Sequence, residues 1–186
     1  EGQLLVRNIF MSVDPYMRLR MDVRMKQFSP FQPGQTLDGA CVGQVIHSNH
    51  REFEAGDFVH SRMGWREYFL SDGESLRKIE AEKVPLQAHL GVLGATGLTA
   101  YVGLCEIGKP QEGETVFVSG ASGAVGSIAC QIARNLGCQV TGSAGSDEKV
   151  SWLMDEAGID AAFNYKKVDD LIAEVGKHCP DGIEVY

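Results

Sequence analysis

No run of apolar residues in the sequence approaches the roughly 20 residues that cross a bilayer as a helix. Clustered Lys and Arg are scarce too: the 186 residues carry a net charge of -8, and the one basic cluster, Arg18, Arg20, Arg24 and Lys26, is local. A surface that binds nucleic acid needs many such cations to neutralise phosphates. We therefore expect a cytoplasmic globular protein whose partner is neither nucleic acid nor a membrane.

Metal-binding patterns are also lacking. The five cysteines and five histidines show neither Cys-x-x-Cys nor His-x-x-x-His spacing, and zinc sites normally use such paired ligands. His47 and His50 are near each other in sequence, which we attribute to chance. Two of the cysteines lie in apolar segments, where a thiol behaves as a small hydrophobic group. We expect neither a metal site nor disulfide bonds.

The most informative segment joins a short apolar run, residues 115–119, to Gly120, Gly123 and Gly126, which are spaced three residues apart. Apolar residues at every fourth position follow and predict a helix that stops at Gly137. Glycines allow a pyrophosphate to approach the amides at a helix N-terminus, where the helix dipole favours an anion. Similar glycines occur in ordinary turns, so a dinucleotide site and a plain turn both remain open at this point.

A second strand, residues 138–142, and a second helical pattern that begins at Ser146 complete a βαβ unit. Sites that select NAD normally place an acidic residue at the end of this strand. The chain has Gly142-Ser-Ala-Gly145 there, while Ser146 offers a hydroxyl and Lys149 a positive charge. The pattern favours NADPH. The alternative is that Ser146 is an ordinary N-cap and Lys149 a solvated surface lysine.

The first half of the chain has a different organisation. Four short extended segments, separated by Gly- and Pro-containing turns, predict a compact β-rich domain: residues 4–9, 40–47, 57–61 and 67–70. Helical stretches begin at Leu86, so a domain boundary is expected within residues 78–95. We divide the chain into residues 1–90 and residues 91–186.

Five motifs occur in a characteristic order: Ser12-Val-Asp-Pro-Tyr-Met-Arg18, Gly94-Ala-Thr-Gly-Leu-Thr-Ala-Tyr101, residues 120–126, residues 145–149, and Phe163-Asn-Tyr-Lys166. Together they resemble the zinc-free medium-chain dehydrogenase/reductases that include prostaglandin reductases, leukotriene B4 12-hydroxydehydrogenase and double-bond reductases. The resemblance covers essentially the whole chain. It implies an α/β protein in which a β-rich (GroES-like) substrate domain precedes a doubly wound Rossmann domain that binds NADP. Both domains would be partial, because the resemblance implies truncation at both ends, the second within a fourth parallel strand.

The resemblance also implies roles for single residues. The turn that would hold the pyrophosphate consists of Gly123, Ala124, Val125 and Gly126. Lys149 and Tyr165 would contact the 2′-phosphate of NADPH, together with the Ser146 hydroxyl considered above. The segment around Thr96 would pass beside the nicotinamide. By their residue types alone, Tyr165 could equally be a packing residue and Thr96 part of a tight helix-entry turn.

Zinc-binding members of the superfamily place a cysteine where this chain has Val13-Asp14, and a histidine where it has Asp38-Gly39-Ala40. Alcohol oxidation would lack its usual Lewis acid here. Conjugate reduction needs none: hydride goes to the β-carbon of an enone or alkenal, and the α-carbon takes a proton. Tyr16 is the candidate catalytic residue, a phenol bonded to the substrate carbonyl oxygen; its alternative is a packing role after Pro15.

Other expectations concern the surroundings of this pocket and the competing functions. We expect Asp14 and Arg18 to pair, and Met63 and Trp65 to form an apolar wall, with a core position for Trp65 as the alternative. The resemblance implies a homodimer when the protein is complete. Quinone reduction and a non-catalytic role, as an NADPH-binding module or inactive fragment, stay open as alternatives to enone reduction.

Overall fold

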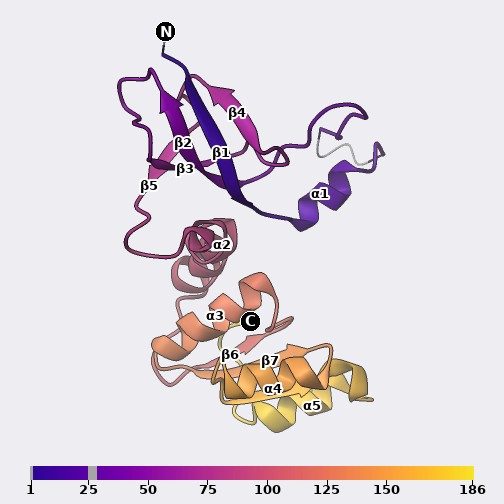
Figure 1. Ribbon diagram of the computed structural model, residues 1–186. Helices are drawn as coiled ribbons and strands as arrows, with labels where there is room; N and C mark the ends of the chain where they lie inside the picture. Colours follow the sequence, from indigo (N-terminus) through magenta and orange to yellow (C-terminus); the bar gives the residue numbers. More distant parts are fainter. Residues whose placement is uncertain (1, 25–28) are drawn as a thin grey trace. The chain divides into compact units, whose positions relative to one another are not determined.

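The computed structural model describes residues 2–24 and 29–186, so Lys26 of the basic cluster lies outside the described residues. The chain folds into two compact units, residues 1–90 and residues 91–186 (Figure 1). No helix in the described ranges has both the length and the apolar character that a membrane span requires.

The first unit is built on a five-stranded antiparallel sheet with the strand order β4-β1-β2-β3-β5. Its strands are β1 (Leu4–Met11), β2 (Cys41–Ser48), β3 (Phe58–Ser61), β4 (Tyr68–Ser71) and β5 (Arg77–Ile79). The predicted β-rich first half is therefore confirmed. Only β5 was not predicted, because three residues are too few to show an alternating pattern.

Alternation along β1 builds the core of this unit. Leu4 and Val6 point to one face and are buried against Val45, Val59 and Phe69 from the neighbouring strands. Burying an aliphatic side chain of this size stabilises a fold by about 1.5–3 kcal/mol. Two short helices complete the unit, α1 (Pro15–Arg20) and the 3-10 helix η1 (Leu86–Leu90).

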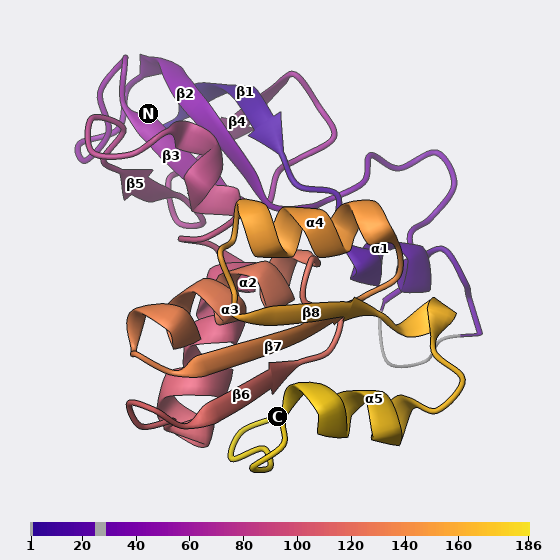
Figure 2. The same ribbon diagram turned by 90° about the horizontal axis from the view of Figure 1, so that it is seen from below.

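The second unit contains a parallel sheet of three strands, β6 (Thr115–Val118), β7 (Gln139–Ala144) and β8 (Ala161–Asn164), which lie side by side in that order (Figure 2). Its longer helices are α3 (Ala124–Asn135), α4 (Asp147–Asp155) and α5 (Leu171–His178). Before them come α2 (Ala95–Tyr101) and the π-helix η2 (Val102–Gly108); the 3-10 helix η3 (Tyr165–Lys167) follows β8. The predicted βαβ unit is confirmed.

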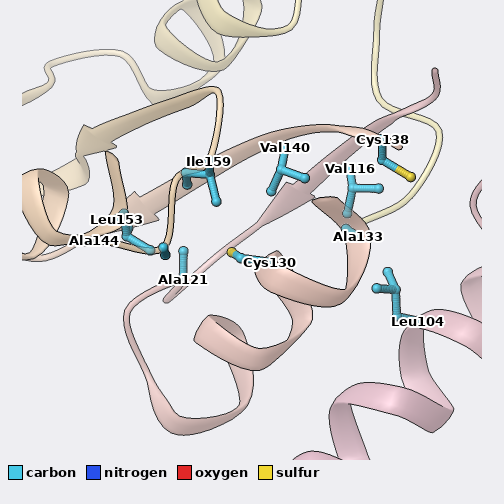
Figure 3. Close-up of a cluster of buried hydrophobic side chains, with 11 residues drawn as sticks. Leu104, Val116, Ala121, Cys130, Ala133, Cys138, Val140, Ala144, Leu153 and Ile159 are labelled. Carbon is cyan, nitrogen blue, oxygen red and sulfur yellow. The ribbon is translucent and has the colours of Figure 1, made fainter. Parts of the chain in front are cut away.

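Both faces of the parallel sheet are covered. Val116 and Val140 pack against Cys130 of α3 and Leu153 of α4, within the cluster shown in Figure 3. On the other face of the sheet, Phe117 of β6 and Phe163 of β8 form a second cluster with residues of α5 and the segment after it. Helices on two faces of a parallel sheet are the doubly wound arrangement that was expected.

The last residues of the chain lie beside β6, on the side opposite β7. Val185 forms a parallel bridge with Val116, and its carbonyl oxygen accepts a hydrogen bond of 2.9 Å from the amide of Phe117. The expected fourth parallel strand is thus present as one bridge instead of a ladder. Across the sheet the order is β8, β7, β6 and then the Val185 segment. The chain thus adds β7 and β8 on one side of β6 and later returns to its other side. Open α/β sheets bind ligands at such a switch point.

Candidate functional site

The glycines of the turn between β6 and α3 stand where a side chain would be strained or crowded. Gly120 has a φ of +59°, and a Cβ on Gly126 would lie 2.5 Å from the carbonyl oxygen of Gly120. A Cβ on Gly123 would lie 3.1 Å from the same oxygen. Only glycine fits at position 126 without moving the backbone. Gly123, Ala124 and Val125, at the N-terminal end of α3, are exposed.

The first amides of α3 are available to a ligand. Gly123 is the N-cap, and no side chain caps the helix. The N–H groups of Ala124, Val125 and Gly126 therefore have no intrahelical acceptor, because the first turn of a helix never supplies one. These three amides and the positive end of the helix dipole fit a pyrophosphate group.

A cavity of about 400 Å³ lies next to this turn, at the carboxyl end of β6. Ser119 and Val125 border it on the turn side, and Tyr186 also lines it, with its hydroxyl 3.2 Å from Oγ of Ser119. Thr99 and Gly103 form the wall contributed by α2 and η2. Thr96 does not line the cavity; its hydroxyl instead donates a 2.9 Å hydrogen bond to the Gly91 carbonyl and fixes the entry to α2. The lining is mostly apolar and includes the hydroxyl-bearing residues Thr99, Ser119 and Tyr186.

The residues expected around a 2′-phosphate lie at one corner, where β7 and β8 end. Ser146 is the N-cap of α4, and its Oγ accepts from the amide of Lys149 at 3.4 Å. Because the oxygen is the acceptor in this contact, the hydroxyl hydrogen is still available to a ligand. Tyr165 reaches the same corner from the far side of Gly145, where an added Cβ would lie 3.0 Å from the Tyr165 hydroxyl oxygen. We name this set, Gly145, Ser146, Lys149 and Tyr165, the phosphate corner.

No carboxylate stands at the end of β7, since Ala144 is its last residue. Lys149 is exposed and, within the part of the chain that the structure describes, has no acidic side chain within ion-pair distance. Two acids, Asp147 and Glu148, lie in the first turn of α4. The carboxylate of Asp147 accepts from the side-chain amide of Asn164 at 2.8 Å and pairs with the ammonium of Lys167. The hydrogen bond from Asn164, and then that from Lys167, hold the pKa of Asp147 below its usual value.

Asn164 and Lys167 were not singled out from the sequence. Their contacts to Asp147 join positions 17 and 20 residues apart. The Phe163-Asn-Tyr-Lys166 motif contains Asn164, but only the fold shows that its side chain reaches α4.

In the first unit, Tyr16 lies in α1 and is half-buried. Its phenol oxygen accepts a hydrogen bond of 3.2 Å from Nη2 of Arg62, and the guanidinium carbon lies 5.8 Å from the ring centroid. Arg62 lies 3.9 Å from Asp38, which already pairs with Arg20 at 2.5 Å. The positive charge of Arg62 is thus only weakly compensated, and it stands beside the phenol.

The expected pair between Asp14 and Arg18 is wrong. Asp14 accepts instead from the Ser12 hydroxyl at 2.8 Å, and among the described residues no ion pair joins it to Arg18. The reason is that α1 begins at Pro15, so Asp14 is the N-cap and lies outside the helix whose spacing would bring the two charges together.

Trp65 and Met63, the two expected wall residues, have different surroundings. Trp65 has a φ of +60°, which is rare for a large side chain, remains 40% exposed and borders an apolar cavity of about 380 Å³ beside Met17 and Leu37. Met63 packs against the core of the first unit. The structure therefore puts Trp65, and not Met63, at a surface hollow.

The residues that could bind a metal are dispersed. In residues 2–24 and 29–186 no three His, Cys, Asp or Glu side chains come together in a way that could hold a metal ion. In the segment from Asp38 to Ala40, the Asp38 carboxylate is already paired with Arg20. Gly39 forms a backbone bridge with Met63.

Comparisons with known proteins agree with this geometry. Residues 1–79 match the family described as the N-terminal domain of oxidoreductase, and residues 124–186 match the zinc-binding dehydrogenase family. The chain is 45% identical over 187 residues to the NADP(+)-dependent 2-alkenal reductase of Nicotiana tabacum, with 100% of this chain and 54% of the relative covered. It is 44% identical over 188 residues to prostaglandin reductase 1 of Rattus norvegicus, with 100% of this chain and 55% of the relative covered. The chain thus spans about half the length of the curated relatives it matches.

Solved structures give the same result. The crystal structure of CurA from Vibrio vulnificus in complex with NADPH superposes with a TM-score of 0.88 at 40% identity, and the match covers 98% of this chain and 54% of CurA. Quinone oxidoreductase structures match at 22% and 24% identity, which shows a shared fold alone. The chain therefore belongs to the medium-chain dehydrogenase/reductase superfamily, and within it to the zinc-free type that includes the prostaglandin and double-bond reductases.

Proposed function

We propose that this chain belongs to an NADPH-dependent reductase that reduces the carbon-carbon double bond of α,β-unsaturated ketones or aldehydes. Residues 91–186 would bind the cofactor, and residues 1–90 would contribute to the substrate site. The observation that carries the proposal is the phosphate corner, where Ser146 and Lys149 begin α4 beside Tyr165 and no carboxylate stands at the end of β7. Relatives at 44–45% identity are named for alkenal and prostaglandin reduction, which supports the same reaction.

Each part of the cofactor has a matching set of residues in the second unit. The amides of Ala124, Val125 and Gly126 would bind the pyrophosphate, and the phosphate corner would bind the 2′-phosphate through one cation and two hydroxyls. The cavity beside Ser119 and Thr99 would hold the nicotinamide ring. When bound, NADPH supplies a hydride to the β-carbon of the substrate.

Tyr16 is proposed as the residue that holds a proton at the substrate carbonyl oxygen. An arginine side chain can only donate, so the phenol oxygen of Tyr16 is the acceptor in its contact with Arg62. The phenol hydrogen is then free to bond the carbonyl oxygen. Negative charge grows on that oxygen as the hydride arrives, and a donor held in place stabilises the transition state more than the substrate.

The proposal includes a small-molecule enone or alkenal substrate and a cytoplasmic homodimer without a nucleic-acid or membrane partner. The net charge of -8 supports the exclusion of nucleic acid. Quinone reduction is the competing activity. It is supported only by structures at 22% and 24% identity, whereas the NADPH complex of CurA shares 40%.

A substrate panel tests the proposal. The intact natural protein is supplied with NADPH or NADH and with methyl vinyl ketone, a straight-chain alkenal, an allylic alcohol or a quinone. We expect NADPH to be consumed with the first two compounds and the saturated carbonyl to be the product in mass spectrometry. Reduction of the quinone alone would favour the competing activity, and cofactor binding without turnover of any compound would indicate a non-catalytic NADPH-binding module.

A further inference from the structure

The carboxylate of Asp147 lies next to the phosphate corner, where a negative charge would oppose the binding of a 2′-phosphate. Asp147 is the first residue of α4, directly after Ser146, and its side chain is exposed. An acid near this position would repel a 2′-phosphate, which is how acidic residues favour NAD over NADP in related sites. Unless its charge is compensated, Asp147 would weaken the binding of NADPH at the phosphate corner.

Both oxygens of the Asp147 carboxylate are engaged. Oδ1 accepts a hydrogen bond of 2.8 Å from Nδ2 of Asn164, and Oδ2 pairs with Nζ of Lys167. Asn164 is the last residue of β8, and Lys167 is the last residue of η3, which follows it directly. A cation next to a carboxylate lowers the field that the carboxylate exerts on a third charge.

Asn164 also connects the two halves of the phosphate corner. Its Oδ1 accepts from the amide of Lys166 at 3.1 Å, which caps the 3-10 helix that carries Tyr165. Its Nδ2 holds Asp147 in the first turn of α4, the helix that carries Lys149. One side chain thus ties the Tyr165 segment to the Lys149 segment across the ends of β7 and β8, where Ala144 pairs with Asn164.

We propose that Lys167 and Asn164 are specificity-determining residues for the 2′-phosphate of NADPH, Lys167 by compensating the charge of Asp147 and Asn164 by holding the two halves of the phosphate corner together. Neither residue needs to touch the cofactor. The inference rests on the proposed function, since it presumes that the phosphate corner receives a 2′-phosphate. It goes beyond that function because it assigns part of the NADPH preference to a contact outside the binding residues.

The test measures binding of two nucleotides that differ in the 2′-phosphate. Isothermal titration calorimetry of the intact protein gives dissociation constants for 2′,5′-ADP and for 5′-AMP. In Lys167→Met the uncompensated carboxylate should raise the dissociation constant of 2′,5′-ADP about threefold, as expected for an exposed charge pair, and leave 5′-AMP unchanged. The increase should shrink at high salt because exposed charges are screened. Asn164→Ala should weaken 2′,5′-ADP as well.

Two further variants separate charge compensation from direct contact. In the double variant Asp147→Asn with Lys167→Met, the repelling charge is gone, so the affinity for 2′,5′-ADP should return to the wild-type value. Lys167→Arg keeps the cation and should behave as the wild type. The matched control is Lys177→Met, which removes another lysine of an exposed ion pair in the same unit, with Glu174; the lysine side chains are 66% and 68% exposed. This control should change neither dissociation constant.

The outcomes separate the two proposals. A preference of the wild type for 2′,5′-ADP that falls about threefold in Lys167→Met and is restored in the double variant supports the inference. An unchanged Lys167→Met, or a double variant that stays weak, overturns it while the proposed function stands. A wild type that binds both nucleotides equally overturns the NADPH assignment and this inference with it.

Discussion

Nη2 of Arg62 lies 3.2 Å from the phenol oxygen of Tyr16, although the two residues are 46 positions apart in the sequence. The contact uses an acceptor site of the phenol and leaves its hydrogen free. Tyr16→Phe should therefore lower kcat for an enone about tenfold to a hundredfold, the loss of one donor to a developing oxyanion. The dissociation constant of NADPH should stay the same.

Steady-state kinetics and cofactor titration of the same preparation check this expectation. Tyr68→Phe is the matched control, because Tyr68 is a half-exposed tyrosine on β4 of the same unit. An unchanged kcat in Tyr16→Phe would leave Tyr16 with a packing role only.

Lys149 should account for most of the preference for NADPH over NADH. Lys149→Ala should remove a charge-assisted contact of about 1–3 kcal/mol, equivalent to a loss of roughly fivefold to 150-fold in NADPH affinity. NADH affinity should not change. Fluorescence titration with both cofactors measures this, with Lys83→Ala as the control, since Lys83 is an exposed lysine paired with Glu80 in the first unit. Equal losses for both cofactors would contradict the assignment.

Gly126 should be intolerant of any side chain. In Gly126→Ala the new Cβ would meet the Gly120 carbonyl oxygen at 2.5 Å, so the turn must shift, at a cost of about 2–4 kcal/mol in the free energy of unfolding. Gly103→Ala is the control, because an added Cβ there meets no atom within 4 Å. That variant should be neutral or up to about 1 kcal/mol more stable. Urea denaturation compares the two; similar midpoints would refute the close packing of the turn.

The elements were predictable from the sequence to the extent that their patterns are local. The alternation in β1 and the apolar spacing that precedes Gly137 depend on neighbours two to four residues away, so the strands and α3 could be predicted. The five motifs indicated the glycine turn and the residues of the phosphate corner, because each motif is a short contiguous stretch of sequence. The β5 strand, at three residues, was below the length at which any period is visible.

Contacts between distant segments were not predictable. The bonds from Asn164 to Asp147 and from Arg62 to Tyr16 depend on which turns the strand order brings together. The incorrect pairing of Asp14 with Arg18 shows the opposite error. It paired two charges that are close in the sequence, but Asp14 is the N-cap of a helix that starts at Pro15, and its carboxylate accepts from the Ser12 hydroxyl instead.

His60 should make the stability of the protein sensitive to mild acid. Burial, and then the positive charges of Arg77, His89 and Arg62, lower the pKa of His60. The unfolded chain therefore takes up a proton near pH 6.5 while the folded one resists it, so stability is complete above that pH and falls as the pH drops below it. His60→Gln should flatten the decline in Tm between about pH 7 and 5. Differential scanning fluorimetry measures the decline, and the exposed His47→Gln is the control; identical profiles for both variants would contradict the role of His60.

Following the transferred hydride tests the proposed conjugate reduction itself. The intact protein is given NADPH that carries deuterium at the transferable position, together with a simple enone. If the proposed conjugate reduction is correct, we expect a saturated ketone with deuterium at the β-carbon. An allylic alcohol with deuterium at the former carbonyl carbon, or deuterium transfer to a quinone alone, would contradict it.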